Sequence, residues 1–391
     1  MKVLILEWKA FGQLEIKDAL NELGHSYVTH PFDYERGESD LEYQHELINA
    51  IQNISPDLVF SFNYFAVISI ACNSLNIKYA SWIYDSPYVQ LYSCTIINPC
   101  NYVFVFDKAL YNEFHSNGIH TVFYLPLAAD AKRLSQMTDF ETFRQTPQRN
   151  ETDIAFVGQL YTEKSQMYSQ LRTIRPYTRG YIEAIMSVQK NVYGYNFIKD
   201  ILPSGIIEDM SYDIHMTKNP NGIETDAYLF AQYVLNRQIT ASERTETLIR
   251  IGSKYKYDLY TTDAYIRLPN CINHGTVSVV ESAPYVYKSA KINLNITLRS
   301  ITTGIPLRAF EIMGCEGFCL SNYQADFGDC YIANEDYVYY ENLDDMMDKI
   351  DYYLTHEKER AEIAHNGFLR TLNCHSYTNR IQTILETIAN N

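Results

Sequence analysis

The sequence predicts two doubly wound α/β domains that face each other across a cleft, with a helical insertion in the second domain. Short apolar segments alternate with longer segments of helical spacing over most of the chain, which is the pattern of strands joined by crossover helices. Most of the apolar segments are continuous rather than alternating, as in parallel strands that helices cover on both faces. A chain of 391 residues also has the length of two such domains.

The first domain is expected at residues 1–150. It begins with an apolar strand at 2–7, and the amphipathic segment at 13–23 then ends at Gly24, a residue type common at helix C-termini. The same alternation continues through the domain. Further strands are expected at 27–30, 57–62, 79–84, 102–106 and 122–125, and further helices at 41–54, 66–75 and 110–117.

The second domain is expected at residues 151–391, after a polar linker at 144–152. Residues from about 165 to 250 are rich in Tyr, Arg and Gln, and turn signals separate their helical pieces, so we expect a helical insertion there. Strand–helix alternation surrounds this insertion. Strands are expected at 153–158, 257–260, 291–295 and 317–321, and late helices at 343–354, 357–366 (stopping at Gly367) and 377–388.

Charge and apolar patterning narrow the class of protein. The formal net charge of −15 argues against a nucleic-acid-binding protein, because neutralising phosphates requires clustered Lys and Arg. The apolar run at 3–6 is too short for a signal peptide, and no stretch of about 18 apolar residues predicts a membrane span. The eight Cys include no CxxC pair. We therefore expect a cytoplasmic protein with reduced thiols and no integral membrane segment.

Ligands of open α/β domains bind at the carboxyl ends of the strands, so the turns at those ends hold the candidate site residues. In the second domain, the strand at 153–158 ends in Gly158, and Lys164 follows it. A glycine lets the backbone approach a phosphate, a helix N-terminus after it would supply free N–H groups, and Lys164 would add a charged contact. The alternative interpretation of this segment is an ordinary tight turn.

A second candidate segment leads into the helix expected before the strand at 317–321. Thr303 and Gly304 stand where a helix N-terminus would bind a pyrophosphate. Arg308 and Glu311 are three positions apart and so share a helical face, where the Arg would neutralise a diphosphate and the carboxylate would hold a ribose diol. Alternatively, these two residues form an ordinary ion pair on a solvated helix face.

Three further residues follow predicted strands. Asp85 would take a proton from a substrate hydroxyl, or it would stabilise a turn or cap a helix. We expect Asp107, at the end of the next strand, to cap a helix. His274, in a loop of the second domain, would contact a base or a sugar, although a lone His is often structural. We find no DxD-type dyad after a strand and therefore expect no catalytic metal.

Six motifs occur along the chain in an order that matches a known family: SWIYDSP at 81–87, VFVFDK at 103–108, YLPLAAD at 124–130, DIAFVGQLY at 153–161, LNIT at 294–297 and GIPLRAFEIMGCEGF at 304–318. Together they resemble the CgeB-like (spore maturation protein) group of GT-B-fold glycosyltransferases. The last motif is the most specific, because it is similar to the E-A-M-A-C-G segment of GT-B enzymes, with Glu311 on its Glu. The resemblance covers nearly the whole chain and is weakest in 165–250.

The resemblance implies a C-terminal domain that binds a nucleoside-diphosphate sugar, with a UDP-sugar favoured, and an N-terminal acceptor domain. Gly158 and Lys164 would lie near the diphosphate, Arg308 near its charge, and Glu311 on the ribose. GT-B enzymes are generally metal-independent, and no other cofactor is expected. The chain departs from the family pattern at three positions. Gln159 stands where relatives often have Arg, Thr303 where many have a first Glu, and Glu316 where Gly is usual.

The expected activity is therefore transfer of a sugar to an acceptor that is a polysaccharide, a protein or a small molecule. Asp85 would be the base if the reaction inverts the anomeric carbon, and the departure at Thr303 leaves retention and inversion both open. Two alternatives remain, because fold alone does not decide function. One is a protein that binds nucleotide sugars without catalysis, and the other is a sugar-nucleotide epimerase.

Overall fold

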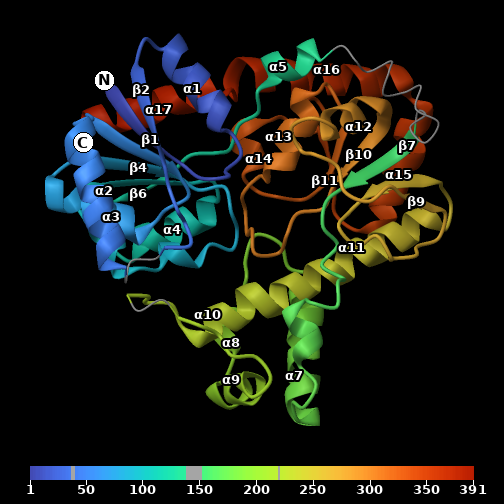
Figure 1. Ribbon diagram of the computed structural model, residues 1–391. Helices are drawn as coiled ribbons and strands as arrows, with labels where there is room; N and C mark the ends of the chain where they lie inside the picture. Colours follow the sequence, from blue (N-terminus) through green and yellow to red (C-terminus); the bar gives the residue numbers. More distant parts are fainter. Residues whose placement is uncertain (37–39, 138–151, 219–220) are drawn as a thin grey trace. The chain divides into compact units, whose positions relative to one another are not determined.

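The computed structural model describes residues 1–36, 40–137, 152–218 and 221–391. These residues form two compact units (Figure 1). The first unit comprises Met1–Leu127, Met216–Thr225 and Tyr377–Asn391, and the second comprises Ala128–His215 and Asp226–Ser376. The domain boundary expected at residue 150, and nearly all of the expected linker, lie in the stretch 138–151, outside the described residues.

The first unit is built on a six-stranded sheet in which every neighbouring pair of strands is parallel. The strand order is β2-β1-β3-β4-β5-β6. All five residues of β3 and of β5 are buried, as expected for continuous apolar strands covered on both faces. The strands are β1 (Lys2–Glu7), β2 (Ser26–Pro31), β3 (Leu58–Phe62), β4 (Lys78–Trp82), β5 (Asn101–Val105) and β6 (Val122–Tyr124).

The helices of the first unit follow the strands in turn, except for the last. The C-terminal helix α17 packs against α1, although some 350 residues separate them in the sequence. Lys78 donates to the carbonyl of Ile388 over 2.7 Å, which fixes the end of α17 to β4. The helices are α1 (Gln13–Glu22), α2 (Leu41–Ile54), α3 (Ala66–Leu75), η1 (Val89–Leu91), η2 (Cys94–Ile97), α4 (Lys108–Ser116) and α17 (Tyr377–Asn390).

The second unit also contains a six-stranded parallel sheet, with the order β12-β11-β10-β7-β8-β9. The chain builds outward from β7 through β8 and β9, and then returns to add β10, β11 and β12 on the other side of β7. This is the doubly wound order of a Rossmann-type domain, and it confirms the predicted fold class. The strands are β7 (Thr152–Val157), β8 (Tyr257–Tyr260), β9 (Cys271–Asn273), β10 (Ala290–Asn295), β11 (Cys319–Asn322) and β12 (Val338–Tyr340).

The segment expected as a helical insertion holds several helices between β7 and β8, and α7 to α9 stand away from the sheet of their unit (Figure 1). The last of them, α11, leads directly into β8 and so serves as the crossover helix. The helices of the second unit are α5 (Ala131–Gln136), η3 (Met167–Gln170), α7 (Pro176–Gln189), α8 (Ile198–Ile201), α9 (Ser204–Ser211), α10 (Asp226–Leu229), the π-helix η4 (Phe230–Leu235), α11 (Asn236–Gly252), α12 (Ala283–Ser289), α13 (Leu307–Gly314), α14 (Phe327–Cys330), α15 (Leu343–Thr355) and α16 (Glu357–Cys374).

The helix expected to stop at Gly367 instead continues through it, because α16 extends to Cys374. A β-carbon at position 367 would lie 2.3 Å from the carbonyl oxygen of Asp336. The glycine is therefore needed for close packing of the helix against a neighbouring backbone, and not for ending the helix. Among the described residues, no helix combines the length and the apolar character that crossing a membrane requires.

Candidate functional site

The topological switch point of the second unit lies between β7 and β10, which pair in parallel at the centre of the sheet. The connections that leave these two strands run to opposite sides of the sheet. Ligands of open α/β sheets bind outside the carboxyl ends of the strands at such a point. The residues that follow Val157 in β7 and Asn295 in β10 are therefore the first candidates for a binding site.

Gly158 follows β7 and makes room for a charged side chain. Its N–H donates to the carbonyl of Tyr260 over 2.9 Å, which extends the pairing of β7 with β8. A β-carbon at this position would lie 2.5 Å from Nη2 of Arg308 and 3.0 Å from its Cζ. The guanidinium of Arg308 therefore rests on the glycine backbone, so the structure brings these two residues together.

Arg308 reaches the switch point from the second position of α13. Its Nη1 donates to Oδ1 of Asn295 at the end of β10 over 3.4 Å, and its Cζ lies 5.1 Å from the centre of the Phe156 ring. The side chain is partly exposed. Arg308 thus spans the ends of β7 and β10.

A second guanidinium, which was not among the predicted site residues, lies at the same place. Arg244 of α11 is 3% exposed, and its Nε and Nη2 donate to the carbonyl of Ile296 over 3.1 and 2.6 Å. Its Nη1 donates to the carbonyl of Gln159. Burial, and then the neighbouring cation of Arg308, lower the pKa of Arg244. The signal in the sequence is that Arg244 shares the buried stripe of α11 with Thr240, Leu248 and Ile251.

The two guanidiniums have neutral partners in the described part of the chain: carbonyl oxygens for Arg244 and an amide oxygen for Arg308. The cations of Arg244 and Arg308 repel each other, and burial raises the cost of that repulsion. An anion with several oxygens would relieve it. The switch point therefore has the chemistry of a phosphate- or diphosphate-binding site.

The segment after Gly158 differs from the prediction. We expected a helix N-terminus there, but residues 159–166 form turns, followed only by the short 3₁₀ helix η3. The insertion occupies the place of the first helix, so no helix dipole points at Gly158 from this segment. Lys164 lies on the exposed part of these turns. Its expected contact with a phosphate stays a prediction.

Thr303 and Gly304 precede the helix α13, as the Gly-Pro turn in the sequence predicts. Pro306 is the N-cap residue of α13, and the helix runs from Leu307. The carbonyl of Thr303 accepts from the N–H of Asp326 over 3.0 Å, and that of Gly304 accepts from Nε2 of Gln324 over 3.1 Å. These two residues are therefore part of a loop fixed by its carbonyls, which holds the start of α13 beside the switch point.

Glu311 lies one turn after Arg308 on α13 and is partly exposed. Arg308 directs its guanidinium to Gly158 and Asn295. An ion pair with Glu311 is therefore not what positions the Arg308 side chain. The role expected for Glu311, binding a ribose, stays a prediction.

The insertion holds the loop between β10 and α13 through Arg299. This side chain is 8% exposed and donates to the carbonyls of Lys190 and Val192 over 2.6 and 3.1 Å. It also forms a buried ion pair with Glu243 of α11, with Nε 2.6 Å from Oε2. Burial alone would lower the pKa of Arg299, but the hydrogen bond to the Glu243 carboxylate raises it overall. The loop is thereby fixed to the end of α7.

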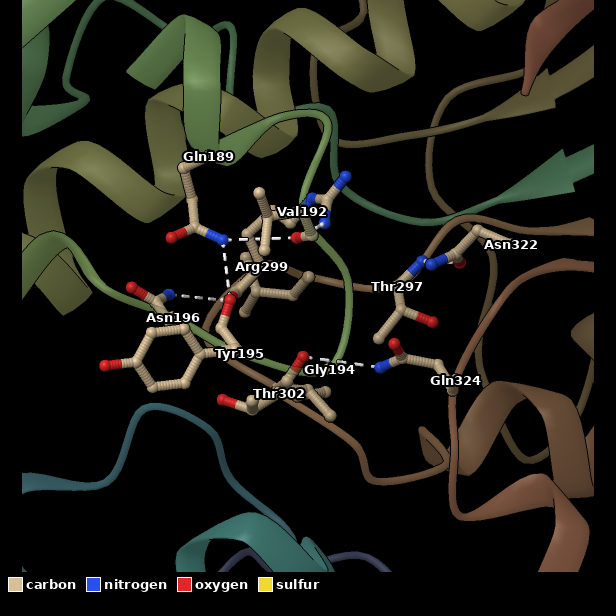
Figure 2. Close-up of a pocket in the computed structure, with 12 residues that line it drawn as sticks. Gln189, Val192, Gly194, Tyr195, Asn196, Thr297, Arg299, Thr302, Asn322 and Gln324 are labelled. Carbon is tan, nitrogen blue, oxygen red and sulfur yellow. Dashed lines mark hydrogen bonds between the residues drawn. The ribbon is translucent and has the colours of Figure 1, made fainter. Parts of the chain in front are cut away.

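Figure 2 shows how the loop and the insertion meet. Gln189 donates to the carbonyls of Val192 and Tyr195, and Gln324 reaches the carbonyl of Ile301 from the other side. The cavity between them has a volume of about 10 Å³, which holds about one water molecule. The contact is therefore a packed structural joint.

A larger cavity, of about 330 Å³, opens at the carboxyl ends of β10, β11 and β12. Its size lies at the lower end of the range for small-molecule sites. Ile296, whose carbonyl holds Arg244, and Glu243, whose carboxylate holds Arg299, both line it. Further lining residues are Lys190, Tyr193, Asn322 and Tyr340. The cavity therefore borders the residues that support the switch point.

His274 packs at the end of β8. Its backbone N–H donates to the carbonyl of Leu259 over 2.9 Å, and its ring stacks on Tyr260 with 4.7 Å between the ring centres. Its Nε2 lies 3.1 Å from Oδ1 of Asp258, and about 10% of each side chain is exposed. These contacts are those of a residue that orders the strand end, which is the structural alternative for His274. A contact with a base or sugar stays untested.

Asp85 lies three residues beyond β4, at the carboxyl edge of the sheet in the first unit. Asn63, directly after β3, donates from Nδ2 to Oδ2 of Asp85 over 2.6 Å and accepts from the N–H of Tyr84 over 3.2 Å. The Asp85 side chain is exposed, yet the protein around it desolvates the carboxylate enough to raise its pKa, and the Asn63 hydrogen bond opposes this. Asp85 is thus positioned by another side chain.

Asp107 has the capping role that the sequence predicted. It is the N-cap residue of α4, and its carboxylate accepts from the N–H of Ala109 over 3.0 Å. Of the two aspartates that follow neighbouring strands, Asp85 is therefore the one whose carboxylate is partly free for chemistry.

Comparison with known proteins now adds to this geometry. Residues 239–386 match the sequence model of a family described as glycosyl transferase-like, which covers less than half of the chain. The chain is similar in structure to Anabaena Alr3699/HepE in complex with UDP and glucose, with a TM-score of 0.54 and 11% identity over 100% of both chains. A glycosyltransferase from Rickettsia africae gives a TM-score of 0.53 and 10% identity, over 100% of this chain and 98% of that one. No curated protein sequence matches.

Sucrose-phosphate synthase from Thermosynechococcus elongatus is also similar, with a TM-score of 0.53 and 9% identity over 100% of this chain and 99% of that one. The chain has the GT-B fold. The GT-B prediction is therefore confirmed, whereas the CgeB-like subgroup stays a prediction. Within this GT-B chain, the region that matches the family begins in α11 and includes Arg244, Arg308 and Glu311. Both guanidiniums of the switch point thus belong to the matched region.

Proposed function

We propose that this chain is a glycosyltransferase that moves a sugar from a nucleoside-diphosphate sugar to an acceptor hydroxyl, with the donor bound in the second unit. The observation that carries the proposal is the pair of guanidiniums from Arg244 and Arg308 at the switch point between β7 and β10. A diphosphate brings the negative oxygens that this pair lacks. Gly158 leaves the room that the Arg308 guanidinium takes at the end of β7.

The structural neighbours support this proposal and suggest the donor. Anabaena Alr3699/HepE has been solved with UDP, with UDP and glucose, and with UDP-glucose. These complexes concern a protein of the same fold at 11% identity. A UDP-sugar is therefore the donor that we propose first. The finer assignment to the CgeB-like subgroup, and a cytoplasmic location, are part of the proposal.

The proposed mechanism uses the charges of the second unit on the leaving group. When the bond between the anomeric carbon and the diphosphate breaks, negative charge grows on the diphosphate, and Arg244 and Arg308 would stabilise it more strongly than in the ground state. Glu311 would hold the ribose, and Lys164 would add charge from the exposed turn. No metal ion is needed in this scheme, as the resemblance predicts.

On the acceptor side, an oxygen of the acceptor hydroxyl forms the new bond to the anomeric carbon and must lose its proton. Asp85 would receive that proton in an inverting reaction, because its carboxylate is fixed by Asn63 and its raised pKa makes it a better base than an ordinary aspartate. The acceptor is a polysaccharide, a protein or a small molecule, and no nucleic acid is expected.

An epimerase is the second candidate. UDP-GlcNAc 2-epimerase from Neisseria meningitidis is similar in structure, with a TM-score of 0.50 and 9% identity over 100% of both chains. An epimerase would convert a free nucleotide sugar without any acceptor. A protein that only binds nucleotide sugars would give saturable binding and no turnover.

A thermal-shift panel tests the donor site first. UDP, GDP, dTDP, CDP and ADP are added with and without magnesium, and a ligand that binds the folded state raises the melting temperature. We expect UDP to stabilise the protein without magnesium, and Arg308→Met to abolish that stabilisation. Lys132→Met, on α5, is a control for loss of one charge elsewhere in the unit. If none of the nucleotides stabilises the wild type at millimolar concentration, the proposed function is wrong.

A further inference from the structure

The first unit has its own topological switch point, between β1 and β3, and aromatic rings gather there. Trp8 follows β1 directly, and its indole Nε1 donates to the carbonyl of Phe62 at the end of β3 over 3.0 Å. The indole is thus fixed across the carboxyl ends of the two strands. By the rule for open α/β sheets, this is where the first unit would bind a ligand.

Three rings adjoin Trp8 and a fourth, Phe11, adjoins Tyr84; together they form what we call the aromatic cluster: Trp8, Phe11, Tyr34, Phe65 and Tyr84. The indole stacks on Tyr84, with 6.2 Å between ring centres and 14° between ring planes. Tyr34 lies 5.4 Å and Phe65 5.7 Å from the indole, and Phe11 lies 6.1 Å from Tyr84. These rings come from the ends of β1 to β4, so the cluster covers the carboxyl edge of the sheet.

The aromatic cluster is only partly covered by the protein. Phe11 is 45% exposed and Tyr34 is 50% exposed, while Trp8 and Tyr84 are half-buried. Rings that are held rigid and partly open offer a flat apolar surface at little cost in side-chain entropy. The matching ligand is one with a flat face of C–H groups, such as a pyranose ring.

Polar groups beside the rings match the hydroxyls of such a ligand. Asp85 adjoins Tyr84, and its carboxylate, held by Asn63, accepts hydrogen bonds from O–H groups. The charge around the cluster is mainly negative. Asp33 and Glu35 are exposed beside Tyr34, Arg36 pairs with Asp40 and Glu46, and Lys9 is the exposed cation next to Trp8. This balance disfavours phosphates and other anions and favours an uncharged partner.

We infer that the aromatic cluster of the first unit binds an uncharged sugar ring, which stacks on Trp8 and Tyr84 and hydrogen-bonds to Asp85. The assignment of this sugar as the acceptor rests on the proposed function. It narrows the acceptor to a carbohydrate, in contrast to the second unit, where paired guanidiniums call for an anion. The sugar ring would place a hydroxyl beside the carboxylate that we propose as the base.

The chain offers a spectroscopic test, because Trp8 and Trp82 are its two tryptophans. Trp82 is 1% exposed, and its Nε1 lacks a hydrogen-bond partner within the described structure, so Trp82→Phe removes no hydrogen bond. In full-length Trp82→Phe protein, all indole fluorescence comes from Trp8. Neutral sugars (glucose, maltose, cellobiose, lactose and N-acetylglucosamine) are titrated into it, with glucose 6-phosphate and sialyllactose as charged comparisons.

We expect a saturable change in Trp8 fluorescence with at least one neutral sugar, and a weaker response to the charged sugars. Phe11→Ala in the same background should weaken binding about fivefold, because it removes one side of the ring surface. Phe11 is exposed enough that this change should not unfold the protein. Tyr212→Ala, which removes a 79% exposed ring at the C-cap of α9, is the matched control and should leave sugar binding unchanged.

The inference is overturned if none of the neutral sugars changes the fluorescence, if only the charged sugars bind, or if Phe11→Ala binds as well as its background. UDP-induced thermal stabilisation is measured on the same proteins to separate the two hypotheses. If UDP binds and neutral sugars do not, the inference fails and the proposed function stands. If neutral sugars bind and no nucleotide does, the sugar site stands, and its role as the acceptor site falls with the proposed function.

Discussion

Nη2 of Arg308 lies 2.5 Å from the point where a β-carbon on Gly158 would stand, so the guanidinium occupies the space that the glycine leaves. Gly158→Ala should therefore push the guanidinium of Arg308 away, and the backbone φ of 157° adds strain of its own at this position. The substitution should weaken UDP binding about tenfold, because Arg308 would lose its position at the end of β7. Calorimetric titration with UDP gives the affinity, and urea unfolding gives the stability. An alanine variant that binds UDP as tightly as the wild type would contradict this arrangement.

Arg244 should contribute affinity for the diphosphate and little for the rest of the nucleotide. In the wild type we expect affinity to rise along the series uridine, UMP and UDP. In Arg244→Met the step from UMP to UDP should shrink by about tenfold or more, because a charge-assisted contact to a phosphate is lost. Uridine affinity should be unchanged, which also shows that the variant is folded. An equal loss for all three ligands would mean that Arg244 is only structural.

The ion pair between Glu243 and Arg299 should dominate the stability of the loop before α13. Glu243→Ala leaves the Arg299 charge buried without its carboxylate, and such losses cost about 3–5 kcal/mol. Glu243→Gln keeps a neutral acceptor and should cost less. Urea unfolding measures both. If Glu243→Ala changes the free energy of unfolding by less than about 0.5 kcal/mol, the pair does not hold the loop.

Asn63 should set the acid limb of the pH profile through Asp85. Desolvation raises the pKa of Asp85, and the Asn63 hydrogen bond partly opposes it. Asn63→Gly removes the hydrogen bond and tolerates the positive φ of 57° at this position. The pKa of Asp85 should then rise further. A base works when deprotonated, so activity lost as the pH falls should be lost at a higher pH in the variant. The measurement is kcat/KM against pH, and an unshifted acid limb excludes Asp85 as the base.

Glu316 follows α13 with a φ of 60°, in the left-handed region that favours glycine. This explains why relatives of the matched motif usually have Gly there. Glu316→Gly should therefore be more stable than Glu316→Ala by about 1 kcal/mol. Both variants lose the exposed contact between Glu316 and His365, so this contact cancels in the comparison. Thermal unfolding of the two variants tests this prediction. If the alanine variant is as stable as the glycine variant, the backbone at position 316 is not strained.

Much of the fold followed from local pattern. Continuous apolar segments became buried parallel strands, and the expected strand at 257–260 matches β8 residue for residue. The helix expected after Gly158 and Lys164 is only the short 3₁₀ helix η3, and the difference has a physical reason. The chain leaves β7 into turns and the insertion, and α11 makes the crossover much later in the sequence.

The site was only partly predictable. Gly158 follows a strand, and Arg308 lies in the first turn of a helix. Topology alone places such positions at the carboxyl edge of a parallel sheet. Arg244 lies in the middle of a helix, and it reaches the site only because α11 packs across the sheet with this face inward. The aromatic cluster was equally hard to predict. Its rings come from the ends of four strands, and no local sequence pattern specifies their order β2-β1-β3-β4.

The helix α17 completes the first unit from the far end of the chain, and this affects how the protein can be made and divided. A ribosome synthesises β1 to β6 early, but the face of the sheet beside α1 stays uncovered until residues 377–391 have emerged. The second unit can be complete before the first. A fragment cut after residue 127 would likewise expose the apolar side of α1, so an isolated first unit should include α17 joined by a linker.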